Sequence, residues 1–165
     1  MKNASQSVTA YIGVGSNLGN PVEHVKRALA ALASLPDTTL EQQSSLFRTT
    51  PIDASGEDFI NTVVKLQTQL NAHDLLRELQ RIESDFGRER PYVNAPRTLD
   101  LDILLYGSQR IASPDLVIPH PRLTQRAFAL IPLLQLDPFI QIPGAGLAHS
   151  FVPNVSGQPI SKIMV

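Results

Sequence analysis

Cysteine is absent from the 165 residues of the chain. Its absence excludes disulfides, thiolate metal sites and cysteine nucleophiles, and it fits a protein of the reducing cytoplasm. Also absent is any apolar run long enough to span a bilayer, and the first residues lack the basic and apolar regions of a signal peptide. We therefore expect a soluble, cytoplasmic protein with no membrane partner.

A dominant charge is lacking as well, because 14 lysines and arginines stand against 15 aspartates and glutamates. A near-neutral chain gives no support for a large nucleic-acid interface. The length is typical of one domain, and we expect residues 1–165 to form a single domain. The arginines are nevertheless concentrated in one region, which contains Arg77, Arg81, Arg88, Arg90 and Arg97.

Several motifs of catalytic and nucleotide-binding sites are missing. No GxxxxGK[ST] loop, HExxH pair or GxSxG elbow occurs, so the sequence disfavours a P-loop, a zinc-protease site and acyl transfer. Gly13, Gly15 and Gly19 follow the spacing GxGxxxG rather than the GxGxxG of dinucleotide sites. This spacing favours a tight turn between a strand and a helix.

The order of the expected elements indicates the fold class. Alternating apolar and polar residues predict strands over residues 8–14, 39–48, 59–70 and 97–106, with a short one near 110–112. Apolar residues at helical spacing predict helices over residues 21–35, 72–86 and 124–134. This order is the split βαβ pattern of a ferredoxin-like α+β fold, with an antiparallel sheet and helices packed on its faces. Residues 1–7 are expected to fray, and residues 138–165 to form an irregular extension.

Four residues are expected to set helix ends. Asn20 and Asn71 precede the first two helices and are good N-caps. Gly87 follows the second helix, where a glycine suits the C′ position. Pro132 is expected to kink or end the third helix, because it lacks an N–H and its ring opposes the preceding turn.

Two aspartates in the 97–106 strand are the first candidate site. Asp100 and Asp102 are two positions apart, so a strand places both carboxylates on one face. Magnesium often binds to one or two carboxylates together with substrate phosphates. Arg97, at the start of the strand, could bind the same phosphates. The alternative is a half-exposed strand with two solvated carboxylates, and this segment alone leaves both readings open.

Three more polar residues are ambiguous on their own. Gln80 and Glu83 lie three residues apart on the second helix, away from its apolar stripe, as on an ordinary solvated helix face. His120 stands between two prolines, where a stiff loop could direct its imidazole at a phosphate or a base. An ordinary surface histidine fits the same pattern.

Taken together, six blocks in this order resemble the 6-hydroxymethyl-7,8-dihydropterin pyrophosphokinase (HPPK) family of folate biosynthesis, from about residue 11 to residue 138. The blocks are YIGVGSNLG (11–19), FRTTP (47–51), FIN (59–61), QRIE with GR (80–88), PRTLDLDIL (96–104) and IPHPR with RAF (118–128). The resemblance implies that a pyrophosphoryl group moves from ATP to a pterin alcohol, with AMP leaving. It also implies a monomer whose partners are these small molecules.

The resemblance implies roles for matching positions. Two magnesium ions would be bound by Asp100 and Asp102, which with Arg88 and Arg97 would form the catalytic set. The ATP side would comprise Gln80, Glu83, Arg88, Arg90, Arg97, Ile103, His120 and Arg126. The pterin pocket would comprise Thr49, Thr50, Ile52, Phe59, Asn61 and Phe128. The two phenylalanines would stack on the pterin ring, and the Asn61 carboxamide both donates and accepts hydrogen bonds, as the pterin edge requires.

The chain also departs from the family pattern. Many relatives have Arg-Trp-Gly-Pro-Arg before the aspartates, whereas residues 93–97 read Val-Asn-Ala-Pro-Arg here and Tyr92 is the nearest aromatic residue. Pro121 stands where an aromatic residue is frequent, and Asp115 where some members have a basic one. These differences concern the nucleotide contacts more than the two aspartates. Two alternatives to the family's activity remain: a magnesium-dependent kinase or nucleotidyltransferase for another planar alcohol, or a ferredoxin-like ligand-binding module without catalysis.

Overall fold

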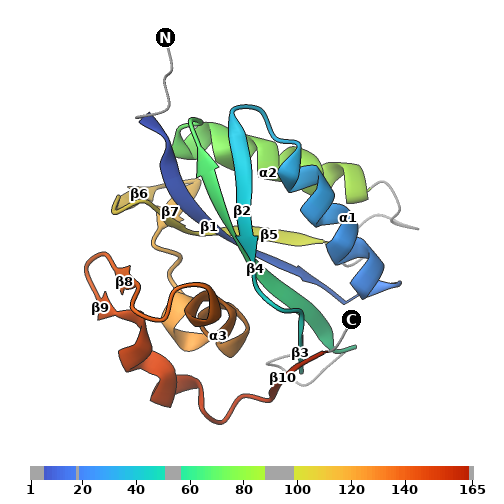
Figure 1. Ribbon diagram of the computed structural model, residues 1–165, viewed down its shortest axis with the longest axis vertical. Coiled ribbons are helices and arrows are strands. Elements are labelled where there is room, and N and C mark those ends of the chain that lie inside the picture. The colour runs from blue at the N-terminus through green and yellow to red at the C-terminus, as the bar shows by residue number, and fades with distance from the viewer. Residues whose placement is uncertain (1–5, 18, 51–56, 88–98, 164–165) are drawn as a thin grey trace.

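The computed structural model describes residues 6–17, 19–50, 57–87 and 99–163. Its main sheet is antiparallel, with the strand order β10-β3-β4-β1-β5 and with β2 paired to β4 (Figure 1). The strands are β1 (Val8–Ser16), β2 (Thr38–Gln43), β3 (Phe47–Thr49), β4 (Phe59–Thr68), β5 (Asp100–Tyr106) and β10 (Ile160–Lys162). The sheet and its helices form the ferredoxin-like α+β fold predicted from the sequence.

Helices α1 (Pro21–Ala33) and α2 (Ala72–Gly87) cover one face of the sheet. The Oδ1 atom of Asn20 accepts a hydrogen bond from the Glu23 amide at 3.2 Å, and Oδ1 of Asn71 accepts one from the Asp74 amide at 2.8 Å. Each cap satisfies a first-turn N–H that has no partner within its helix, so both predicted N-caps are confirmed. Helix α2 includes Gly87, one residue beyond its predicted end.

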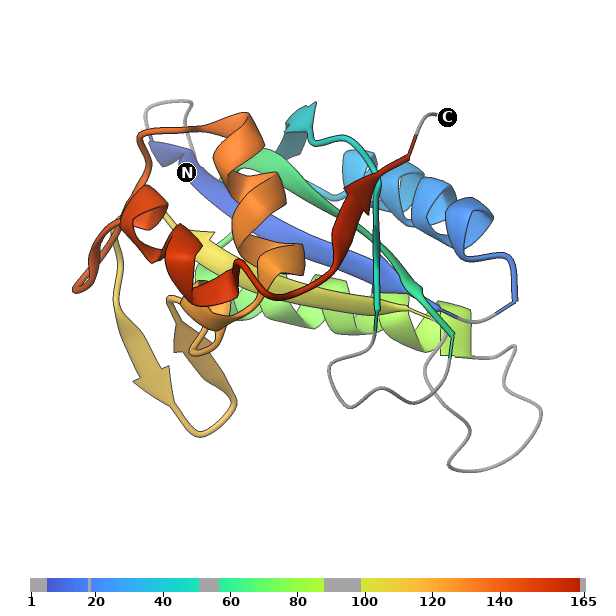
Figure 2. The ribbon, with the colours of Figure 1, turned by 90° about the horizontal axis from the view of Figure 1, so that it is seen from below.

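Helix α3 (Ala127–Leu136) and the C-terminal residues cover the opposite face, as both ribbon views show (Figures 1 and 2). Strand β1 shows why the core has two halves. Its Ile12 side chain is buried beneath α1 and α2, whereas its neighbour Tyr11 is buried on the α3 face. Alternation along the strand therefore directs apolar residues into both halves, because both faces of the sheet are covered.

Strand β5 alternates as predicted only as far as Leu104. A register shift between β1 and β5 places Leu105 in the α3-side core and Tyr106 in the opposite core, which reverses the faces predicted for these two residues. An extra residue in one strand of a pair shifts every later side chain to the other face. The aspartates precede the shift and keep their predicted face.

The strand predicted over residues 39–48 is two strands. Strand β2 ends at Gln43 and β3 begins at Phe47, with both pairing to β4. Between them, the Ser44 hydroxyl accepts a hydrogen bond from the Val63 amide at 3.0 Å. The predicted position at the margin of the sheet is confirmed for β2, whereas β3 has a further strand beside it.

The third predicted helix also differs. A short 3-10 turn, η2 (Leu123–Gln125), is followed by α3, which contains Pro132 and continues to Leu136. Of the two outcomes expected at Pro132, a kink or an end, the end is excluded, because the helix continues for four residues beyond it. The next residue, Leu133, is fully buried. Burial of a leucine side chain contributes about 1.5–3 kcal/mol, which offsets the cost of a proline within the helix, about 3 kcal/mol.

The C-terminal residues form regular elements, so the prediction of an irregular extension is wrong. These elements are β8 (Gln141–Ile142), β9 (Gly146–Leu147), the 3-10 helix η3 (Ala148–Val155) and β10. Strand β10 joins the main sheet beside β3, with Ile160 opposite Thr49 (Figure 2). A three-residue strand has too little alternation to be recognised from sequence, because its stability depends on the edge it joins.

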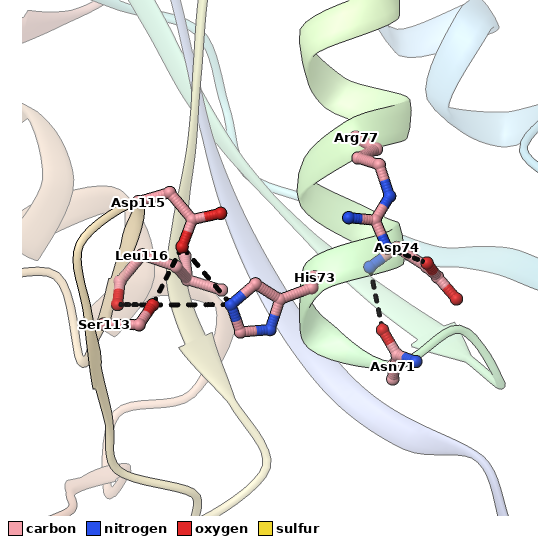
Figure 3. A network of polar contacts seen from close by, with 7 residues as sticks. All are labelled: Asn71, His73, Asp74, Arg77, Ser113, Asp115 and Leu116. Carbon is pink, nitrogen blue, oxygen red and sulfur yellow. Dashed lines mark hydrogen bonds and ion pairs between the residues drawn. The ribbon is translucent and has the colours of Figure 1, made fainter.

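The remaining hairpin consists of β6 (Ile111–Ser113) and β7 (Leu116–Ile118), of which the sequence predicted only the first strand. His73 of α2 contacts it, because Nε2 lies 3.4 Å from both Oδ1 of Asp115 and Oγ of Ser113 (Figure 3). The Ser113 hydroxyl donates to Asp115 at 2.9 Å, and this bond is the main cause of the lowered pKa of the Asp115 carboxyl. Among the described helices, none is long and apolar enough to cross a membrane.

Candidate active site

A cavity of about 400 Å³ opens over the main sheet beside the start of α3. Its walls come from β1, β3, β4, β5 and the segment that enters α3. The lining residues are Gly13, Val14, Gly15, Thr49, Thr50, Phe59, Asn61, Asp100, Asp102, Leu104, Arg122, Arg126, Phe128 and Ala129. Segments that lie far apart between residues 13 and 129 thus meet in one concave site.

The two aspartates line this cavity from β5, which confirms that they share one face of the strand. Across the sheet Asp100 lies opposite Gly15 and Asp102 opposite Gly13. Because glycine has no side chain, β1 contributes only backbone atoms beside both carboxylates, and the positions that Cβ atoms would take are approached by Oδ1 of Asn61 above Gly15 and by Leu104 above Gly13. This donor set fits magnesium, which needs only one or two protein carboxylates when phosphates and water complete its coordination. The described residues contain no cluster of three His, Asp or Glu that would bind a metal by protein ligands alone.

A buried amide stands on the other side of Gly15. In the sheet register Asn61 of β4 lies opposite Gly15, and its Nδ2 donates to Oγ1 of Thr49 at 2.8 Å. Both side chains are buried, with 5% and 4% of their surfaces exposed. The hydrogen bond to Thr49 fixes the Asn61 carboxamide at the cavity wall.

Two aromatic rings complete this end of the cavity. Phe59 comes from β4 and Phe128 from the first turn of α3, and both are half-buried. Five of the six residues predicted for the pterin pocket therefore line one cavity: Thr49, Thr50, Phe59, Asn61 and Phe128. The sixth, Ile52, lies outside the described residues.

Positive charge gathers at the cavity around Asp102. Arg122 and Arg126 both line it, and the guanidinium carbon of Arg126 lies 5.4 Å from the centre of the Phe128 ring. Burial lowers the pKa of Arg126, Arg122 lowers it further, and Asp102 opposes both effects. An arginine still remains charged at neutral pH. The cavity therefore combines two carboxylates with two cations.

His120 does not line this cavity; it lines a second hollow, together with Pro119 and Pro121. Its Nδ1 accepts a hydrogen bond from the Arg122 amide at 3.2 Å, and its own amide donates to the Leu104 carbonyl at 3.0 Å. Burial lowers the pKa of the imidazole, Asp102 raises it, and Arg126 and Arg122 lower it. The neutral form of the imidazole is therefore favoured. Because Nδ1 accepts a hydrogen bond, the proton of the neutral ring is on Nε2, which can act as a donor.

Other predicted residues of the ATP side lie outside the cavity lining. Ile103 is buried beneath the helices, because strand alternation directs it away from the aspartates. Gln80 is exposed on α2, whereas Oε2 of Glu83 accepts a hydrogen bond from the Leu101 amide at 2.8 Å. Arg88, Arg90 and Arg97 lie outside the described residues.

The sequence did not assign six lining residues: Gly13, Val14, Gly15, Leu104, Arg122 and Ala129. Gly13 and Gly15 belong to β1 and form the cavity floor, so the turn expected at these positions begins later. Leu104 could have been found, because it continues the alternation of Asp100 and Asp102. Arg122 lies in the IPHPR block but carried no signal of its own.

The HPPK family model, described as 7,8-dihydro-6-hydroxymethylpterin-pyrophosphokinase, matches residues 11–138. The chain belongs to this family. It is 43% identical to the 2-amino-4-hydroxy-6-hydroxymethyldihydropteridine pyrophosphokinase of Pseudomonas aeruginosa, over 81% of this chain and 83% of that protein. It is 38% identical to the protein of the same name from Haemophilus influenzae, over 94% of this chain and 98% of that protein. The family resemblance found in the sequence is confirmed.

Solved HPPK structures share the fold. A crystal structure of Plasmodium falciparum HPPK-DHPS with pterin and p-hydrobenzoate superposes with a TM-score of 0.74, at 12% identity and over 96% of this chain. Another, of HPPK-DHPS in complex with substrates, gives a TM-score of 0.72 over 89% of this chain. This chain spans less than half the length of these two solved chains, 48% and 43%. The likeness supports the ferredoxin-like architecture.

Proposed function

We propose that this cavity transfers the pyrophosphoryl group of ATP to the hydroxymethyl group of 6-hydroxymethyl-7,8-dihydropterin, a step of folate biosynthesis. The substrate oxygen attacks the β-phosphorus and forms a new O–P bond. The bond between the β-phosphorus and the oxygen that bridges it to the α-phosphorus breaks. AMP leaves with that oxygen, and the hydroxyl proton is released. The observation that carries the proposal is that Gly15 separates Asn61 from Asp100 in the cavity floor.

The pterin occupies the aromatic end of the cavity in this proposal. Phe59 and Phe128 contact the faces of the ring, which offers a planar heterocycle a large apolar surface. Asn61 recognises the amide-like edge, with its orientation set by Thr49. Thr50 and Ile52 complete this pocket.

The aspartates form the centre of the site. Asp100 and Asp102 would hold two magnesium ions, and ions bound there would neutralise phosphate charge and activate the attacking hydroxyl. Glu83 supports this arrangement by its hydrogen bond to the Leu101 amide, between the two aspartates. Little covalent chemistry is left to the protein, so catalysis depends on position and charge.

The cations bind ATP phosphates. Arg126 lines the cavity together with Arg122, which we add to the predicted set. In the described part of the chain, neither guanidinium forms an ion pair with a carboxylate, so both remain available to phosphate oxygens. We keep Arg88, Arg90, Arg97, Gln80, Glu83, His120 and the backbone of Ile103 as proposed ATP contacts. Arg88 and Arg97 are also proposed to stabilise the charge of the transition state.

A cytoplasmic monomer with no nucleic-acid or membrane partner remains our prediction for the state of the protein. An ordinary kinase acting on another planar alcohol would retain the two aspartates, but it would have no need for the Asn61, Phe59 and Phe128 set. The products distinguish the two reactions. We expect the full chain, incubated with ATP, magnesium and the hydroxymethyl dihydropterin, to release AMP and form a pterin diphosphate. Release of ADP instead would refute pyrophosphoryl transfer.

A further inference from the structure

A glutamine from the C-terminal segment holds the backbone on both sides of Arg126. Oε1 of Gln158 accepts a hydrogen bond from the Ala127 amide, and its Nε2 donates to the Gln125 carbonyl, each at 2.8 Å. Gln158 is separated from these residues by more than 30 positions in the sequence. The two bonds therefore join two distant segments on either side of one cavity residue.

This contact satisfies a need of helix α3. Arg126 occupies the N-cap position with an extended backbone, and its own side chain makes no capping hydrogen bond. The Ala127 amide is one of the first-turn donors that has no partner within the helix. Gln158 supplies that partner, and it also satisfies the carbonyl of the residue before the cap. A carboxamide can do both because it carries an acceptor and a donor.

The side chains on either side of this contact belong to the proposed site. Arg126 and Phe128, one residue on either side of Ala127, both line the cavity, and the guanidinium carbon of Arg126 lies 5.4 Å from the centre of the Phe128 ring. The orientation of the first turn of α3 sets where both groups lie. A shift of about 1 Å in such a positioning element can reduce the rate by two orders of magnitude.

The C-terminal segment also reaches the opposite wall of the cavity. After Gln158, strand β10 pairs with β3, and Ile160 lies opposite Thr49, the partner of Asn61. A smaller hollow of about 210 Å³ is lined by residues 157–159 together with Thr49, Thr50 and Phe128. The segment thus connects the two sides of the pterin end, α3 and β3.

We propose that Gln158 is a positioning residue for pyrophosphoryl transfer: by fixing the backbone at residues 125 and 127, it holds Arg126 toward the phosphates and Phe128 against the pterin. This inference rests on the proposed function of the cavity. It extends the site beyond residue 138, where the match to the family model ends. Gln158 touches neither substrate in this proposal and acts through the residues it orients.

A second glutamine provides a matched control for removing the Gln158 side chain. Gln135, near the other end of α3, also makes two hydrogen bonds, accepting from the Ser45 amide at 2.7 Å and donating to the Ser45 hydroxyl at 2.8 Å. Neither Gln135 nor Ser45 lines the cavity. Gln158→Ala and Gln135→Ala therefore remove the same number of bonds from opposite ends of one helix.

The test is the separate measurement of KM for the pterin, KM for ATP, kcat and the melting temperature in both variants. We expect Gln158→Ala to raise both KM values by roughly tenfold, whereas Gln135→Ala leaves both within about twofold of the wild type. Gln158→Glu should fall between wild type and Gln158→Ala, because a carboxylate still accepts from Ala127 but cannot donate to Gln125. Exchange of the Ala127 amide hydrogen should accelerate in Gln158→Ala and remain unchanged in Gln135→Ala.

The outcomes separate the two proposals. If the wild-type chain turns over and Gln158→Ala has the KM values of Gln135→Ala, the positioning role is refuted while the function stands. If the wild-type chain releases no AMP, the proposed function fails, and the positioning role fails with it. Loss of cooperative unfolding in Gln158→Ala, with normal KM values in Gln158→Glu, would show a structural role only and would also refute it.

Discussion

A Cβ atom on Gly15 would lie 2.6 Å from Oδ1 of Asn61, which is closer than real Cβ contacts allow. The same glycine lies opposite Asp100 on its other side. Adjacent strands are about 4.8 Å apart, so roughly 10 Å separates the backbones that carry Asn61 and Asp100. Gly15 therefore makes room for the carboxamide oxygen of Asn61, the proposed pterin-binding group, on the strand that lies next to the proposed metal-binding carboxylate of Asp100.

Gly15→Ala should displace the Asn61 carboxamide and break its bond to Thr49. We expect KM for the pterin to rise at least tenfold, and overpacking to reduce the free energy of unfolding by about 1–3 kcal/mol. Gly13→Ala is the control, because its Cβ would lie 3.5 Å from Leu104, an ordinary contact. A wild-type KM for the pterin in Gly15→Ala would show that the approach of Gly15 to Asn61 has no role in pterin binding.

Asp102→Asn tests the carboxylate pair. Asp102 is exposed, so the substitution should leave cooperative unfolding intact. The loss of one magnesium ligand should reduce kcat by roughly 10²–10³-fold or more. Asp115→Asn, an exposed aspartate of the β6–β7 hairpin, serves as the control and should retain kcat. Wild-type turnover in Asp102→Asn would remove this residue from the proposed metal site.

Arg122→Ala tests the cation that the sequence did not assign. Because Arg122 is exposed, its contribution to phosphate binding is screened by salt, and we expect KM for ATP to rise about three- to tenfold. Arg77→Ala, which removes an exposed arginine paired with Asp74 at 2.6 Å on α2, should leave KM for ATP unchanged. The assignment fails if the two variants bind ATP alike.

The pKa of His120 should report the charges at the cavity. In the metal-free protein we expect it to lie below the ordinary 6.5, because burial disfavours the imidazolium. Removing the anion in Asp102→Asn should lower it further, and removing the cation in Arg122→Ala should raise it. NMR titration of the His120 ring protons measures all three values. Shifts of the same sign in both variants would contradict the proposed charge arrangement.

The lowered pKa of His120 also determines whether this residue makes the folded protein more or less stable as the pH falls. Below pH 6.5 the unfolded chain binds a proton at His120 while the folded chain does not, so this residue makes stability fall as the pH falls toward the folded pKa. Below the pKa that His120 has in the folded protein, the residue is protonated in both states, and its effect on the free energy of unfolding no longer changes with pH. Urea unfolding of the metal-free protein between pH 5 and 7.5 should show a smaller decrease in His120→Asn than in the wild type.

The features that the sequence predicted correctly depend on neighbours in the chain. Asn20 and Asn71 were recognised as caps because the amides they bind are three residues away. Asp100 and Asp102 were placed on one face because strand alternation is local. The family motifs then grouped the aspartates with Asn61, Phe59 and Phe128, which no periodicity could bring together.

The features that the sequence missed depend on distant partners. Gly15 is required because of Asn61, which lies 46 positions later and meets it only through β-sheet pairing. Gln158 finds its partners in another segment, and the three residues of β10 form a strand only because β3 offers an edge. From Leu105 onward the side chains of β5 point to the opposite faces from those predicted, because of a register shift between β1 and β5 that the sequence pattern does not reveal.

One isotope experiment tests the central claim most directly. ATP carries radioactive phosphorus at its β-position, and the measurement is which product contains this label after the reaction. The full chain is incubated with this ATP, magnesium and the hydroxymethyl dihydropterin, and the products are separated. If the cavity transfers a pyrophosphoryl group, the label appears in the pterin product while the nucleotide product is unlabelled AMP. Label retained in ADP, with an unlabelled pterin monophosphate, would contradict it.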